Sequence, residues 1–125
     1  MQLVSAIMRV VNAFSQTDNR ITIKETDMLY MIHFHDNADA DPDIRPRFMR
    51  QHLAFLGENK GMIRAAGPLK EEDGTVKSGL WLVDVDTAEQ AWALVKADPF
   101  WPTSLRDVIE IKQWVQVFAD GQALV

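Results

Sequence analysis

The chain contains no cysteine, and this absence excludes several kinds of chemistry. Without thiols there are no disulfides, no thiolate metal ligands and no cysteine nucleophile. The sequence also contains no phosphate-binding P-loop, no dinucleotide-binding glycine fingerprint and no Gly-x-Ser-x-Gly nucleophile elbow. A chain without cysteine suits a reducing compartment, so we expect the protein to be cytoplasmic.

Runs of positive charge and long apolar runs are missing as well. The chain has 13 basic and 18 acidic residues, a net charge of −5, so we expect no binding to nucleic acid or to an anionic membrane surface. No apolar run approaches the roughly 20 residues of a membrane span. The apolar segment 1–15 lacks a basic start and is interrupted by Arg9, which argues against a signal peptide.

A length of 125 residues with 47% hydrophobic residues fits one globular domain, to which residues 1–27 form an appendage. Apolar residues recur at helical spacing over 1–15 and are followed by a polar linker, so we predict an amphipathic N-terminal helix. This helix is expected to pack on the domain or on a neighbouring subunit. Alternatively, Met28 is the natural start. We place the domain at 28–120 and a C-terminal tail at 121–125.

From Met28 onward the sequence alternates between strand and helix periods. The expected elements, in chain order, cover 28–35, 47–59, 62–69, 76–85, 88–97 and 107–118. Gly67 and Pro68 are expected to end the second strand, and Thr87 to cap the second helix with Gln90. The order β-α-β-β-α-β predicts an α+β, ferredoxin-like fold with a four-stranded antiparallel sheet and both helices on one face.

The last strand is predicted to be apolar on both sides. The side that does not face the helices would carry Val108, Trp114 and Phe118. An apolar sheet face open to water is unfavourable for a monomer. We therefore expect a homodimer that packs these side chains against a second copy.

His52 and Asp98 are the candidate catalytic pair. His52 lies four residues after Phe48 and four before Leu56, on the apolar stripe of the first helix, so it is either a core histidine or a functional one. Asp98 precedes a proline at the end of the second helix, where it commonly forms a turn. Together the two residues would suit general acid–base chemistry near neutral pH.

His33 and His35 are two residues apart on a strand and therefore point to the same face. With Asp36 they resemble the beginning of a metal site, but the sequence shows no third clustered ligand, and open zinc sites need three. No metal is therefore predicted. If this face lines a dimer cleft, His33 becomes a pocket residue. Trp81 and Trp101 are either core residues or walls of a substrate pocket.

Five short motifs in this order resemble the YciI-like (YCII-related) family. They are Met28-Leu29-Tyr30-Met31-Ile32, Arg50-Gln51-His52-Leu53, Ala65-Ala66-Gly67-Pro68-Leu69, Asp98-Pro99-Phe100 and Ile111-Lys112-Gln113-Trp114. The resemblance covers about residues 28–118. It implies a dimeric α+β barrel similar to muconolactone isomerases, with an active site built on His52 and Asp98. It also implies cofactor-free elimination or isomerisation of small cyclic compounds.

Two functions follow as hypotheses. In the first, the protein is a small lyase or isomerase without a cofactor, in which His52 moves a proton and Asp98 orients it. The expected substrate-binding residues are His33, Arg64, Gly67, Pro68, Trp81, Phe100 and Trp101. Among them Arg64, or backbone N–H groups near Gly67, would stabilise an oxyanion. In the second, the same pocket binds a small molecule in a non-catalytic or regulatory dimeric module. Contact between His52 and Asp98 beside an open pocket favours the enzyme.

Overall fold

The computed structural model describes residues 28–125, so the expected N-terminal helix and linker lie outside the described residues. Residues 28–113 form one compact unit. Its elements are β1 (Leu29–Asp36), α1 (Ile44–Glu58), β2 (Ile63–Lys70), β3 (Val76–Asp84), α2 (Ala88–Ala97) and β4 (Arg106–Gln113). Within the described part of the chain, no helix is long and apolar enough to cross a membrane.

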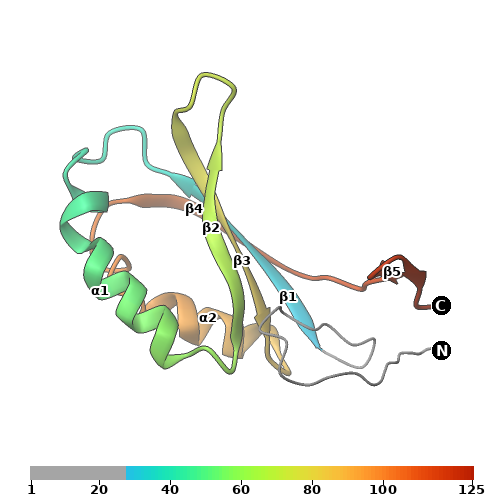
Figure 1. Cartoon of the computed structure of the whole chain (residues 1–125). Helices are drawn as coiled ribbons and strands as arrows, with labels where there is room; N and C mark the ends of the chain where they lie inside the picture. Colours follow the sequence, from blue (N-terminus) through green and yellow to red (C-terminus); the bar gives the residue numbers. More distant parts are fainter. Residues whose placement is uncertain (1–27) are drawn as a thin grey trace. The chain divides into compact units, whose positions relative to one another are not determined.

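The sheet has the strand order β2-β3-β1-β4, and each neighbouring pair is antiparallel. Both helices lie on the same side of it (Figure 1). Strands β1 and β3, which are far apart in the sequence, are central neighbours, with Ile32 opposite Trp81. This arrangement confirms the predicted α+β, ferredoxin-like fold.

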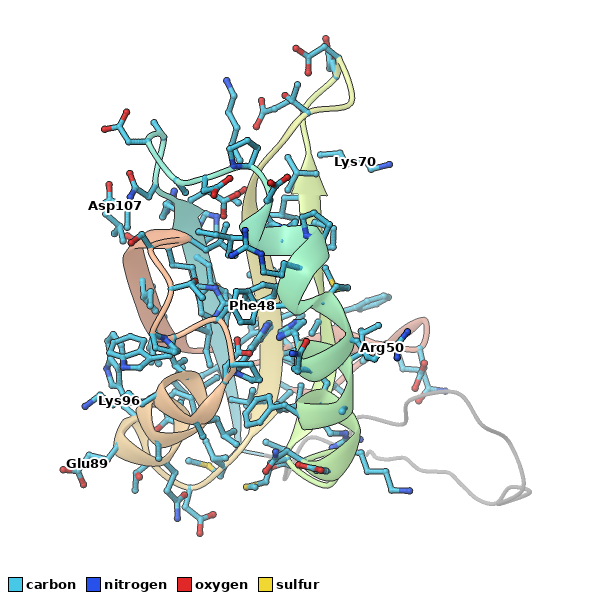
Figure 2. The ribbon with its side chains drawn as sticks, turned by 90° about the vertical axis from the view of Figure 1, so that its left-hand side faces the viewer. Phe48, Arg50, Lys70, Glu89, Lys96 and Asp107 are labelled. Atoms are coloured by element: carbon cyan, nitrogen blue, oxygen red, sulfur yellow. The ribbon has the colours of Figure 1, made fainter. Side chains whose placement is uncertain are left out.

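The core lies between the helices and one face of the sheet. Ile32 and Phe34 of β1 alternate with more exposed neighbours, as do Trp81 and Val83 of β3, because successive side chains of a strand point to opposite faces. The helices contribute Phe55, Ala91, Leu94 and Val95. Figure 2 shows Phe48 of α1 on the inner side, whereas Glu89 and Lys96 of α2 project outward. On the helix-covered face, the two central strands are therefore closed to solvent.

The second strand and the first helix differ from their expected boundaries. The expectation that Gly67 and Pro68 end a strand is wrong, because β2 continues through them to Lys70. Strand β2 is at the sheet edge, where a proline removes no hydrogen bond that a neighbour needs. Helix α1 begins at Ile44, before the expected start, and holds Pro46 in its first turn. There the missing N–H is one that the helix would leave unpaired.

The last strand also ends earlier than expected. Strand β4 stops at Gln113, which lies opposite Tyr30 near the beginning of β1, so the prediction of one strand as far as Phe118 is wrong. Residues Phe118–Ala119 (β5) and Gln122–Ala123 (β6) instead pair as a small antiparallel hairpin. Its two turn residues, Asp120 and Gly121, have φ angles of 53° and 77°, as a type I′ turn requires.

Candidate active site

Asp98 is held at the C-terminal end of α2. The expected capping box is present at the other end, where Thr87 and Gln90 exchange hydrogen bonds, and it fixes the start of the helix. The backbone of Asp98 is extended (φ −66°, ψ 136°), as a residue before proline requires. Its Oδ1 accepts a hydrogen bond from the backbone N–H of Phe100 at 3.2 Å. Asp98 is therefore the predicted turn former, and it is also almost fully buried, with 1% of its surface exposed.

His52 reaches the same carboxylate from the middle of α1. Its Nδ1 lies 2.8 Å from Oδ1 of Asp98, and only 8% of the residue is exposed. Because an ionised carboxylate only accepts, Nδ1 is the donor and Nε2 of a neutral imidazole is the acceptor. Nε2 forms no hydrogen bond with any residue that the structure describes. The imidazole is thus held through one nitrogen, and the other is unengaged.

Aromatic rings fix the plane of this imidazole. The ring of Trp81 stacks on it with a centroid distance of 6.1 Å and an interplanar angle of 29°. The ring of Phe100 lies closer, at 4.7 Å, with a tilt of 42°. Trp81 and Phe100, two of the expected pocket residues, therefore enclose His52 from β3 and from the turn after α2. Such packing restricts rotation of the side chain and so preserves its contact with Asp98.

Arg106 completes the site and was not among the expected residues. Its Nη1 donates to Oδ2 of Asp98 at 2.6 Å, from the first position of β4. Its guanidinium stacks 3.9 Å from the ring centroid of Phe34 and also lies near the rings of Trp81 and Phe100. The sequence position of Arg106 could have indicated this role, because only a short loop separates it from the Asp-Pro-Phe turn and it begins the last strand.

The charges of the site support one another. Burial raises the pKa of Asp98. The hydrogen bond from His52 and the positive charge of Arg106 lower it by a larger amount, so the pKa of Asp98 is below its ordinary value. Burial lowers the pKa of Arg106, and the negative charge of Asp98 opposes this decrease. Arg106 is still charged at neutral pH, because the pKa of an arginine is far above 7. The site at pH 7 therefore contains a carboxylate held between a guanidinium and an imidazole.

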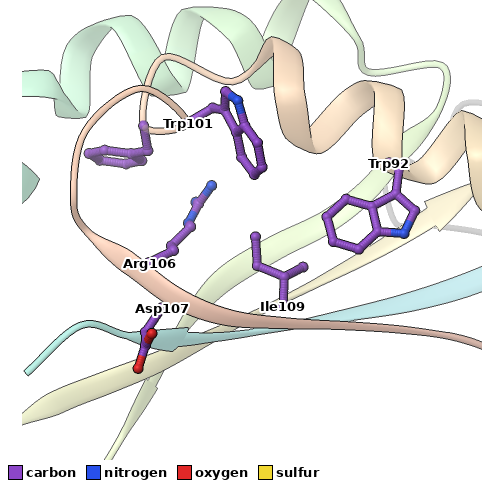
Figure 3. A pocket seen from close by; sticks show the side chains of 6 residues that line it. Trp92, Trp101, Arg106, Asp107 and Ile109 are labelled. Atoms are coloured by element: carbon purple, nitrogen blue, oxygen red, sulfur yellow. The ribbon is translucent and has the colours of Figure 1, made fainter.

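A pocket of about 270 Å³ opens beside this network. Its walls are Trp92, Phe100, Trp101, Arg106, Asp107 and Ile109. Figure 3 shows Arg106 pointing into the space below Trp101, while the Asp107 carboxylate points away from it. Phe100 and Arg106 belong both to the pocket wall and to the surroundings of Asp98. His52 is not among the described residues that line the pocket, so the pocket touches the network through these two side chains.

The remaining expected site residues lie elsewhere. Gly67 and Pro68 are exposed positions of the edge strand β2. If residue 79 had a side chain, its Cβ would lie 3.3 Å from the carbonyl oxygen of Gly67. The close approach of these two strands accounts for glycine at position 79. Arg64 donates to Asp84 at 3.1 Å, which gives it a partner on β3. The guanidinium that contacts Asp98 is that of Arg106 instead.

His33 lies on the sheet face opposite the helices, because it alternates with the buried Ile32 and Phe34. It is accompanied there by His35 and by Glu110 of β4. The expectation that no third metal-ligand type would join the two histidines is wrong. Glu110 stands directly opposite His33 in the register of β1 and β4. The order of the strands, which places β1 beside β4, is the signal that could have found it.

Comparison with known proteins agrees with this architecture. The sequence model of the YCII-related domain matches residues 28–115. The chain belongs to the YCII-related domain family. No curated protein matches this YCII-related chain in sequence.

Several solved structures resemble this YCII-related protein, among them two from Burkholderia. One is 5-chloro-2-hydroxyhydroquinone dehydrochlorinase from Burkholderia phenoliruptrix AC1100, in complex with 2,5-dihydroxybenzoquinone. It has 22% sequence identity and a TM-score of 0.62, and the match covers 70% of this chain and 93% of the other. The second is an uncharacterised NIPSNAP domain protein from Burkholderia xenovorans, with 19% identity, a TM-score of 0.43 and coverage of 71% and 93%. The first likeness establishes a shared fold.

Proposed function

We propose that this YCII-related protein is a small lyase or isomerase that transfers a proton on a small cyclic or aromatic compound without a cofactor. The observation that carries the proposal is the buried contact of 2.8 Å between Nδ1 of His52 and Asp98, with Nε2 unengaged by the described residues. This is the arrangement in which a carboxylate orients a general base. The shared fold with a dehydrochlorinase supports the substrate class.

In this proposal Nε2 of His52 removes a proton from a carbon of the substrate. Asp98 holds the imidazole by its Nδ1–H and stabilises the imidazolium that forms. In an elimination, the electron pair of the broken C–H bond forms a double bond and the leaving group departs with its own electron pair. In an isomerisation, the imidazolium returns the proton to a different carbon. Both reactions balance without an external oxidant or reductant.

The pocket wall supplies what such a substrate needs. A cavity of about 150 Å³ is enough for benzene, so about 270 Å³ holds one substituted ring. Phe100, Trp101 and Trp92 offer apolar faces to that ring. Arg106 presents a positive charge, which would stabilise an enolate or phenolate oxygen that gains negative charge during proton removal. From the sequence, Arg64 was expected to have this role.

The test is a pair of matched histidine variants. Candidate substrates are halogenated hydroquinones and small lactones, followed by absorbance. We expect His52→Asn to lower turnover by about 10²–10⁴-fold, the usual contribution of general acid–base catalysis. His35→Asn, on the opposite face, should leave turnover unchanged. If His52 is only a core residue, His52→Asn should instead lower the free energy of unfolding by about 1–3 kcal/mol, with turnover retained.

A second candidate function is a module that binds a small molecule without converting it. One observation favours it, namely that the described lining of the pocket includes Arg106 and Phe100 but not His52. In this case Trp101→Ala should weaken ligand binding in calorimetry, and His52→Asn should leave it unchanged. Turnover of any bound compound by the wild-type protein decides for the enzyme.

We also propose that the protein is a homodimer whose copies meet through the uncovered sheet face. Leu69, Leu80 and Val108 are exposed on the compact unit, and Leu80 and Val108 lie on strands whose alternate residues face the core. Trp114 and Phe118, also expected at the interface, are exposed as well. Light scattering should give twice the chain mass of 14.2 kDa. Leu80→Glu should reduce it to one chain. A stable wild-type monomer at micromolar concentration would contradict the dimer, and with it a pocket role for His33.

A further inference from the structure

Three ligand-type side chains converge on the sheet face opposite the catalytic pair. His33 and His35 extend from β1, and Glu110 extends from the neighbouring β4. Glu110 is the register partner of His33, and His35 is the next residue of β1 on the same face. One ligand atom from each of the three lies within 4.8 Å of the others. Two strands therefore build a compact cluster of two imidazoles and one carboxylate.

The distances within the cluster match the spacing of metal ligands. Nδ1 of His33 lies 3.5 Å from Oε1 of Glu110, and Nε2 of His35 lies 3.2 Å from the same oxygen. With zinc–ligand bonds of about 2.0–2.1 Å, the edges of a coordination tetrahedron measure about 3.3–3.4 Å. Two of the three required edges are thus close to their values in a zinc site. The rings of His33 and His35, with centroids 4.2 Å apart, are already neighbours.

In a single chain the cluster is also open to an incoming ion, and in the proposed dimer it would lie at the interface, beside Leu80 and Val108. The side chains of His33, His35 and Glu110 are 28%, 43% and 47% exposed. This exposure leaves room for water in the fourth position, as in zinc sites with three protein ligands. The hydrogen bond from His35, followed by the nearby positive charges, lowers the pKa of Glu110, so the carboxylate is ionised at neutral pH. The positive charge of Lys112, on the same strand as Glu110, opposes the binding of a cation.

We propose that His33, His35 and Glu110 bind one divalent transition-metal ion of the zinc class. Imidazole ligands select zinc, cobalt, nickel and copper over magnesium and calcium, which prefer oxygen. The site is separate from His52 and Asp98 and does not depend on the proposed enzymatic function. All three histidines of the sequence lie in the described part of the chain, and two of them are in this cluster.

The experiment is calorimetry with ZnCl₂ on the tag-free chain, after removal of metals with EDTA and exchange into a buffer that does not bind zinc. We expect one Zn²⁺ per chain and no heat with MgCl₂. His33→Ala, His35→Ala and Glu110→Gln should each weaken Zn²⁺ binding at least tenfold. His52→Asn removes the remaining histidine, and Glu89→Gln removes an exposed carboxylate of α2; both should bind Zn²⁺ as the wild type does. Circular dichroism confirms that each variant is folded.

Two further measurements locate the ion. In ¹⁵N–¹H spectra of the imidazoles, Zn²⁺ should shift the signals of His33 and His35 and leave those of His52 in place. Lys112→Gln should bind Zn²⁺ more tightly, because it removes the opposing charge. Absence of Zn²⁺ binding, binding that survives both His33→Ala and His35→Ala, or binding that is lost with His52→Asn would each overturn the proposal.

Discussion

The two faces of the sheet carry the same chemical groups in opposite environments. On the helix-covered face, an imidazole and a guanidinium contact the carboxylate of Asp98, which is 1% exposed. On the other face, two imidazoles contact the carboxylate of Glu110, and all three side chains are partly exposed. The contacts are shorter on the buried face, 2.8 and 2.6 Å against 3.5 and 3.2 Å on the other. The two clusters therefore differ in burial and in how closely their groups approach.

This difference teaches how environment assigns a role. Away from water, the attraction between charges is strong, and loss of one partner leaves the other without hydration. The Asp98 cluster is therefore rigid and suits positioned proton transfer. Near water, the same attraction is screened and contributes little to stability. In a single chain the Glu110 cluster is therefore accessible and can exchange its mutual contacts for an ion.

The largest expected effect is that of Asp98→Asn on stability. An amide keeps one acceptor oxygen but presents no charge to Arg106, whose guanidinium stays buried among aromatic rings. Breaking a buried ion pair in this way lowers the free energy of unfolding by about 3–5 kcal/mol. Urea denaturation at pH 7 measures it.

The matched control for this variant is Asp84→Asn. Asp84 also accepts from an arginine, at 3.1 Å, but both side chains are partly exposed. Such a pair contributes about 0–1 kcal/mol. Equal losses for the two variants would show that burial is not what distinguishes the Asp98 cluster.

Arg106→Lys is expected to have the next largest effect. Lysine keeps the positive charge toward Asp98 but loses the planar stacking on Phe34, 3.9 Å away. A desolvated cation–π contact of this kind is worth about 1–2 kcal/mol, which urea denaturation can resolve. Arg47→Lys is the control, because Arg47 is exposed and lies 6.0 Å from the ring of Phe48. An Arg106→Lys protein as stable as the wild type would assign the stabilisation to charge alone.

These two clusters also show what sequence reasoning can and cannot find. Periodicity predicted the order of the elements, and the proline after Asp98 predicted where α2 ends, because both signals are local. The contact of His52 with Asp98 was expected from a family resemblance, not from spacing. Arg106 and Glu110 were missed because their partners come from other elements, and only the strand order brings them together. The end of β4 depends likewise on where its partner β1 begins.

The pH dependence of stability gives a smaller effect with a definite sign. The pKa of Asp98 in the folded protein is below its ordinary value, since His52 and Arg106 favour the charged form more than burial disfavours it. The ionised Asp98 therefore makes its full contribution to the free energy of unfolding above the ordinary carboxyl pKa of about 3.9. This contribution is lost as the pH falls through the lower pKa that Asp98 has in the folded protein. The difference in unfolding free energy between wild type and Asp98→Asn should shrink from pH 5 toward pH 3. A difference that grows between pH 5 and pH 3 would contradict this cause.

The smallest expected effect is that of Glu110→Gln in metal-free protein. The pKa of Glu110 is lowered as well, first by the hydrogen bond from His35, so any contribution has the same sign as that of Asp98. Yet this carboxylate is exposed, and water replaces the lost contacts. The urea midpoint in the presence of EDTA should match that of the wild type, in low salt and in 1 M NaCl alike. With Zn²⁺ added, the wild type should gain more stability than Glu110→Gln, because an ion that binds only the folded state shifts the equilibrium toward it and binds the wild type more tightly. A large decrease in the urea midpoint of Glu110→Gln in EDTA would instead show that the Glu110 cluster stabilises the fold, as the Asp98 cluster does. Burial would then not explain the contrast between the two faces.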